Sequence, residues 1–105
     1  MTAASADVML FGHTHKPYHK VLSEELEGQV HYRHAINTGS VGKPKDGDPR
    51  ACYVLLHVAD APDASRADCV QVEFVRVPYD VERAAQAVEA SPLPDAFARM
   101  LRAAV

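Results

Sequence analysis

The sequence has little net charge, few cysteines and no long hydrophobic run. Its 11 basic and 14 acidic side chains give a formal net charge of −3, so it lacks the positive field that general nucleic-acid binding needs. No stretch approaches the ~20 apolar residues of a membrane span. Residues 1–6 carry neither the positive charge nor the apolar core of a signal peptide. These absences favour a single cytoplasmic domain over residues 1–105 that binds neither nucleic acid nor membrane.

Cysteine is scarce, with only Cys52 and Cys69 in the chain. The expected strand pairing puts Val58 near Cys69 and leaves Cys52 about six residues away, or ~20 Å along its strand. That separation is far beyond the reach of a disulfide. We therefore expect two reduced, buried thiols, and no zinc site, since no Cys-x-x-Cys spacing occurs.

Alternating and continuous apolar segments predict a sheet-rich fold. Val30, Tyr32, His34 and Ile36 fall on one face of a half-buried strand, and an acidic turn at 24–28 precedes it. The nearly continuous apolar segment 51–59 is typical of a strand covered on both faces, and it includes His57 as a core histidine. The expected strands are 7–11, 18–22, 29–37, 51–59 and 69–77.

Two helices are expected after the strands. Asp80 is a candidate N-cap for the first, and Asp95 begins the second after the Pro-bearing segment 91–94. The second helix carries Phe97 and other apolar residues in one stripe, which predicts core contacts on a sheet. The fold class predicted from the whole pattern is α+β, with a mostly antiparallel sheet and one or two C-terminal helices.

The most informative motif is Gly12-His13-Thr14-His15, which follows the apolar segment 7–11. Two imidazoles two residues apart, where a strand passes into a loop, can both face one opening. Neutral imidazole suits Zn, Fe, Ni and Mn-type ions. A His-x-His pair also occurs by chance, so the motif gains weight from a second one, Asn-Thr-Gly-Ser-Val-Gly, at 37–42.

Together the two motifs resemble the carboxy-terminal part of the calcineurin-like metallophosphoesterases, and most closely the small bacterial members. The first resembles the family's last metal motif, Gly-His-x-His. The second resembles the Asn-Pro-Gly-Ser loop that follows it, with Thr38 where proline is usual. The resemblance extends over essentially the whole chain and implies the second half of an α/β/β/α sandwich.

The resemblance also implies a role for each motif residue. In such enzymes two divalent ions (Mn, Fe, Zn or Ni) act together on a phosphoester. His13 would bind one ion and His15 the other. The remaining motif residues would support the ligands or contact the substrate, and no catalytic residue is assigned. These supporting positions are Gly12, Thr14, Asn37, Gly39 and Ser40.

The chain departs from the family in one important respect. The other metal motifs (Asp-x-His, Gly-Asp-x-x-Asp, Gly-Asn-His-Asp or -Glu, and a lone His) would precede Gly12, and none fits the eleven residues there. We therefore expect the C-terminal portion of a two-metal phosphomonoesterase or phosphodiesterase. It would be inactive alone, bind metal weakly or not at all, and require a missing N-terminal half or self-association.

Two alternatives remain open at this point. The chain could be a catalytically silent scaffold that uses the same fold to bind partners, with His13 and His15 as relics. It could also be an independent β-rich domain that dimerises to cover its open face.

Overall fold

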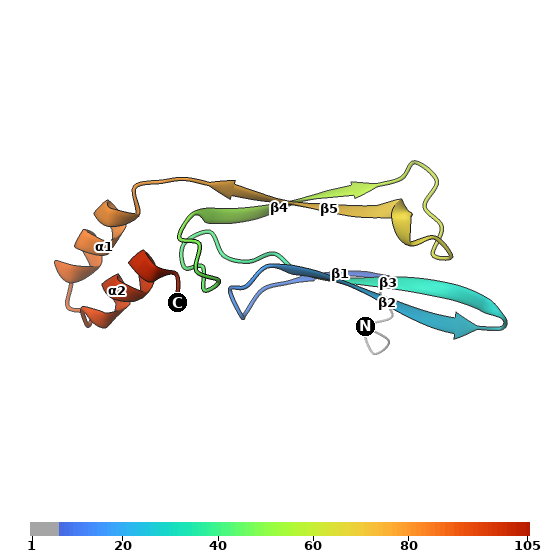
Figure 1. The fold of residues 1–105 in the computed structure, drawn as a ribbon, viewed down its shortest axis with the longest axis horizontal. Coiled ribbons are helices and arrows are strands. Elements are labelled where there is room, and N and C mark those ends of the chain that lie inside the picture. Colours follow the sequence, from blue (N-terminus) through green and yellow to red (C-terminus); the bar gives the residue numbers. More distant parts are fainter. Residues whose placement is uncertain (1–6) are drawn as a thin grey trace.

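The structure, a computed structural model, describes residues 7–105 and confirms the α+β class and the order of elements (Figure 1). Among these residues no helix has the length and apolar character needed to cross a membrane. The elements are β1 (Val8–Phe11), β2 (Tyr18–Leu26), β3 (Gln29–Asn37), β4 (Ala51–Val58), the 3-10 turn η2 (Ala67–Cys69), β5 (Val70–Val77), α1 (Val81–Glu89) and α2 (Ala96–Ala103).

The first sheet has the strand order β1-β3-β2. β1 pairs in parallel with β3, and β2 pairs with β3 in the antiparallel sense. The expected strand at 18–22 is too short, because β2 continues to Leu26 and includes part of the acidic segment. The turn is only Glu27 and Gly28, both with positive φ (51° and 78°), as in the tightest hairpins, so pairing persists to Leu26↔Gln29.

The second sheet is the antiparallel hairpin β4-β5, in register from Ala51↔Val77 to Val58↔Val70. Among the described strands two of the three pairings are therefore antiparallel, as expected. Cys52 and Cys69 are both buried, as expected, and the register places them near opposite ends of the hairpin.

The molecule is elongated, with extents of 59 × 26 × 17 Å. Its radius of gyration is 17.9 Å, against about 13 Å for a compact domain of this size. The two sheets lie as layers with the helices at one end (Figure 1). Among the described residues the buried apolar side chains include Ile36, Pro44, Cys52, Cys69, Ala85, Ala98 and Ala104.

The expectation that strand 51–59 is covered on both faces is wrong. In β4 the side chains of Tyr53, Leu55 and Val58 are 45%, 41% and 51% exposed. Among the described strands only β5 pairs with β4, so one edge and much of its surface remain open. Within residues 7–105 no element packs over these exposed apolar side chains.

The helices pack mainly on each other. Asp80 caps α1 by accepting a hydrogen bond from Arg83 N at 3.0 Å, and Arg102 of α2 contacts Glu82 of α1 at 2.7 Å. The expected packing of the α2 stripe on a sheet is wrong: Phe97 is 40% exposed and faces the loop after β3. The pair stands at the end of the sheets because residues 78–80 lead away from β5 (Figure 1).

Two histidines differ from the sequence expectation. His57 is exposed on β4 (59% of the side chain) and lies 3.5 Å from Glu73, so the core-histidine interpretation is wrong. His34, expected at a surface or half-buried position, is only 3% exposed because it lies in the central strand β3. Its Nδ1 is 2.9 Å from His19 Nε2, and the two rings stack with centroids 5.2 Å apart.

The His34 environment predicts a pH-dependent stability. Burial, and then the charge of His19, lower the pKa of His34 below its ordinary value of 6.5. The unfolded chain therefore binds more protons than the folded chain just below pH 6.5. The contribution to the free energy of unfolding is lost as pH falls from 6.5 through the lower, folded pKa.

Urea denaturation between pH 5 and 8 measures this contribution. His34→Gln is expected to flatten the pH dependence, whereas His57→Gln, at an exposed position, should retain it. Equal pH dependence in the wild type and in His34→Gln would contradict the prediction.

Candidate metal centre

The strand register brings the two sequence motifs together. Asn37, the last residue of β3, is opposite Phe11 at the end of β1 and opposite Tyr18 at the start of β2. The histidine loop (residues 12–17), which joins β1 to β2, must therefore arch over the end of β3. His13 and His15 therefore lie close to the start of the second motif, where Asn37 bonds to Gly12 and Thr14.

The Asn37 side chain joins the two motifs directly. Its Nδ2 donates to Gly12 O at 3.1 Å and to Thr14 Oγ1 at 2.9 Å. Its Oδ1 accepts from Gly39 N at 2.9 Å. The residue is fully buried, and each part of its amide has a partner. It holds the residues on both sides of His13, Gly12 through its carbonyl and Thr14 through its hydroxyl.

The histidine loop has a strained main chain. His13 and His15 have φ of 84° and 61°, in the left-handed region that non-glycine residues avoid. That conformation costs roughly 1–2 kcal/mol per residue. Such strain gathers at ligand-binding positions when the surroundings hold it in place. Here the Asn37 amide supplies part of that restraint.

His15 has a defined tautomer. Its Nδ1 is 2.8 Å from Lys43 O, and a carbonyl can only accept, so the Nδ1 proton is donated and Nε2 keeps its lone pair. Metal-binding imidazoles use the same arrangement. Lys45 N also donates to His15 O at 3.0 Å, so the lysine loop (residues 42–47) holds both the side chain and the main chain of His15.

His13 and His15 are two imidazole donors, and their surroundings add no third. Within residues 7–105 no group of three or more His, Cys, Asp or Glu side chains is placed to hold an ion. The carboxylates that follow Lys43 and Lys45, the residues in contact with His15, are already paired with arginines. The residues present could therefore supply some of the ligands of a metal centre but not the full set.

Those carboxylates belong to the segment 46–50. Asp46 pairs with Arg76; burial raises its pKa, but the hydrogen bond and charge of Arg76 outweigh burial and leave the pKa lowered. Asp48 accepts from Arg50 at 2.7 Å, and this hydrogen bond lowers the pKa of Asp48 to about 2. Both groups stabilise the loop as carboxylates.

Ser40 and Gly39 shape the second motif. Ser40 Oγ accepts from Lys43 N at 2.9 Å and its carbonyl accepts from Cys52 N at 3.1 Å, a structural use of the residue. Gly39 has φ of 75°, and an added Cβ would lie 3.2 Å from Cys52 Sγ and 3.3 Å from Pro17 Cβ. The position accepts no side chain without rearrangement.

Sequence reasoning missed Lys43 as a contributor to the site. It holds His15 through its main-chain carbonyl, a group that every residue carries, so no side-chain pattern could reveal it. The only sequence signal is its place directly after the second motif, just before Pro44.

Comparisons with known proteins bear on the fold. No protein-family profile matches the chain. The crystal structure of a metallophosphoesterase from Sphaerobacter thermophilus is similar over 94% of this chain and 42% of its own, with a TM-score of 0.67 and 31% identity. This match supports assignment of the fold to the metallophosphoesterase superfamily.

A relative in sequence has no assigned function. It is an uncharacterized protein of Methanocaldococcus jannaschii, 33% identical over an alignment of 98 residues that covers 85% of this chain and 36% of that protein. The chain thus spans less than half the length of either protein.

The Asn37 contacts predict a destabilising isosteric change. Asn37→Asp removes both N–H donors and places a carboxylate against Gly12 O, so a loss of about 1–3 kcal/mol in the free energy of unfolding is expected. Chemical denaturation measures it. Gln71→Glu, the same amide-to-acid change at an exposed position, is the matched control. Equal effects of the two substitutions would contradict a special role for Asn37.

Proposed function

We propose that this chain supplies one side of a two-metal phosphoesterase centre that hydrolyses phosphomonoesters or phosphodiesters. His13 would bind one divalent ion (Mn, Fe, Zn or Ni) and His15 the other. The observation that carries the proposal is the strained histidine loop, which Asn37 and Lys43 hold in one conformation. The similarity to a metallophosphoesterase supports it.

Each residue of the site has a defined task in this proposal. His15 offers Nε2, because Nδ1 is committed to Lys43 O. His13 offers an exposed imidazole from the same loop. Gly12, Thr14, Asn37, Gly39 and Ser40 keep the loop in place through main-chain and side-chain hydrogen bonds. When bound, a pair of ions supplies polarisation of the phosphoryl oxygens and lowers the pKa of water.

The centre would need ligands from outside these 105 residues. Two neutral imidazoles cannot hold two divalent ions, because carboxylates are also needed to offset their charge and to bridge them. The chain alone is therefore expected to bind metal weakly and to show no hydrolysis above background.

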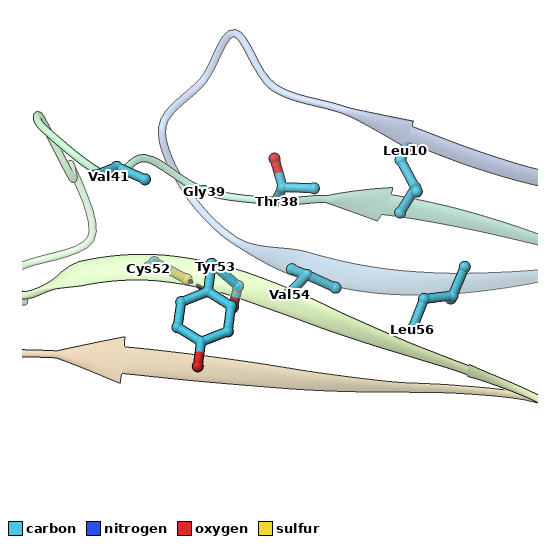
Figure 2. A pocket seen from close by; sticks show the side chains of 8 residues that line it. All are labelled: Leu10, Thr38, Gly39, Val41, Cys52, Tyr53, Val54 and Leu56. Carbon is cyan, nitrogen blue, oxygen red and sulfur yellow. Dashed lines mark hydrogen bonds between the residues drawn. The ribbon is translucent and has the colours of Figure 1, made fainter.

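The groove between the sheets is where such a complement would pack. Figure 2 shows this groove, of about 250 Å3, bordered by Leu10 on β1, Val41 in the second motif and Tyr53 and Leu56 on β4. These four side chains are 50%, 67%, 45% and 37% exposed. Thr38 and Gly39 line the same groove, so it reaches the candidate site.

Two free strand edges flank this groove. β1 and β4 each have one pairing partner among the described strands. An added strand on either edge would satisfy main-chain groups and bury apolar surface together. We propose that the remainder of the enzyme covers this surface, carrying the missing ligands, and self-association of the chain is the alternative.

A catalytically silent scaffold is the second candidate function. It is favoured by the two-donor site, since residues 7–105 hold no third metal-binding side chain near it. In that case the open apolar surface would bind a partner and the histidines would be dispensable. A neighbouring reading frame with Asp-x-His and Gly-Asp-x-x-Asp motifs would favour the enzyme, and its absence would favour the scaffold.

A chimera tests the proposal. The matched 42% of the Sphaerobacter metallophosphoesterase is replaced by residues 7–105, and hydrolysis of bis(p-nitrophenyl) phosphate is measured with Mn2+ and with chelator. We expect metal-dependent hydrolysis by the chimera and none by the 105-residue chain. A folded chimera without activity, where the unaltered Sphaerobacter protein is active, would contradict the proposal. Robust hydrolysis by the chain alone would contradict the proposal that the remaining metal ligands come from outside it.

A further inference from the structure

The lysine loop lies between His15 and the helix pair, and Lys43 contacts both. Its carbonyl oxygen is 2.8 Å from His15 Nδ1. Its ammonium nitrogen is 5.4 Å from the centre of the Phe97 ring on α2, within the range of a cation–π interaction. One residue thus connects the candidate metal ligand to the C-terminal helices.

Two further contacts make this connection continuous. Gly47 N donates to Ala104 O, just after α2, at 3.0 Å. Lys45 N donates to His15 O, also at 3.0 Å. Pro44 lies beside Lys45 in the same loop and is fully buried. The lysine loop is therefore tied to α2 at one end and to His15 at the other.

The helix pair and the loop enclose an apolar groove of about 350 Å3, lined by Gly42, Lys43, Val88, Leu93, Phe97 and Leu101. Phe97 is 40% exposed, so its ring borders the groove and also faces the Lys43 ammonium. Truncating the ring would enlarge the groove and release the Lys43 side chain. No other described aromatic ring faces a lysine in this way.

We infer that the α1–α2 pair positions His15, with Phe97 as the positioning residue that acts through Lys43. The strained main chain of His15 would relax if its neighbours allowed it, and the lysine loop is the neighbour that holds it. The helices limit the movement of that loop. The value of positioning His15 for metal binding rests on the proposed function, but the tautomer of His15 can be measured without metal.

The test is side-chain 15N NMR of the metal-free 105-residue chain at about pH 9, above the range in which histidine ordinarily titrates. The wild type is expected to show His15 with its proton on Nδ1. Phe97→Ala is expected to shift the ratio of the two tautomers at least twofold toward Nε2–H, in line with the strength of an exposed cation–π contact.

Controls keep the result specific. Tyr79→Ala removes an aromatic ring of similar exposure (38%) that borders no part of the groove, and it should leave His15 unchanged. The signals of the His19–His34 pair report whether the fold is intact. If Phe97→Ala disturbs the fold, Phe97→Leu keeps an apolar side chain in the groove, removes the ring and should still shift the tautomer ratio.

An unchanged His15 tautomer in a folded Phe97 variant would overturn the inference. In the active chimera, Phe97→Ala should also weaken Mn2+ binding by about two- to fivefold. The two claims fail separately. A tautomer shift in the chain with an inactive chimera would reject the proposed function alone, and an active chimera with an unchanged tautomer would reject the positioning role alone.

Discussion

His13→Ala and His15→Ala are each expected to lower metal-dependent hydrolysis by the chimera by at least about a thousandfold. Removing a ligand weakens the binding of an ion that stabilises the charge of the transition state by several kcal/mol. Each ~1.4 kcal/mol of lost stabilisation lowers the rate tenfold. The loss should appear in kcat/KM together with a lower Mn2+ content per protein. Neither histidine has a role in the core, so both variants should fold.

His57→Ala and His31→Ala are the controls, because both residues lie on strands outside the two motifs. His57 is exposed and His31 contacts Asp7 at 2.6 Å. Neither substitution should change hydrolysis or metal content by more than about twofold. Activity indifferent to His13→Ala and His15→Ala would contradict the assignment of both ligands.

Gly39→Ala is expected to lower the free energy of unfolding by about 2–4 kcal/mol. The position has φ of 75°, which costs roughly 1–2 kcal/mol for a residue with a Cβ. The new methyl would also lie 3.2 Å from Cys52 Sγ and 3.3 Å from Pro17 Cβ, closer than ordinary contacts. Urea denaturation at neutral pH measures the loss.

Gly42→Ala is the matched control in the same segment. No atom lies within 4 Å of the position that the new methyl would take, and the φ of Gly42 is not in the left-handed range. The expected change is small, between no effect and a slight stabilisation from reduced freedom of the unfolded chain. Equal losses for the two substitutions would show that Gly39 is not specially constrained.

The order of elements could be predicted because local patterns decide it. The period of two in residues 29–37 and the turn composition around Gly28 are properties of adjacent residues. The sequence also places each motif directly after an expected strand. Once β1 and β3 pair in parallel, Phe11 and Asn37 must end side by side.

Burial could not be predicted in the same way, because it depends on neighbours that are distant in sequence. The apolar segment 51–58 is typical of a covered strand, yet β4 has one partner and an open edge among the described strands. For this reason His34 is buried although a surface or half-buried position was expected, and His57 is exposed although a core position was expected. β3 is central in its sheet, whereas β4 belongs to a two-stranded one.

The contacts that hold the site were predicted only in part, because Asn37 was expected to support the ligands and Lys43 was not. Sequence predicted the identities of His13 and His15 but not their left-handed main chain or the tautomer of His15. Those features depend on the Lys43 carbonyl and the Asn37 amide, which reach the loop only in the folded chain. A donor or acceptor that belongs to the main chain leaves no trace in residue types.

Anomalous scattering from crystals of the chimera grown with Mn2+ tests the central claim most directly. Two peaks about 3.5–4 Å apart are predicted, one within bonding distance of His13 and the other bound by Nε2 of His15. His15 Nδ1 should remain hydrogen-bonded to Lys43 O. Ions bound elsewhere with both imidazoles free, or His15 bound to metal through Nδ1, would contradict the account.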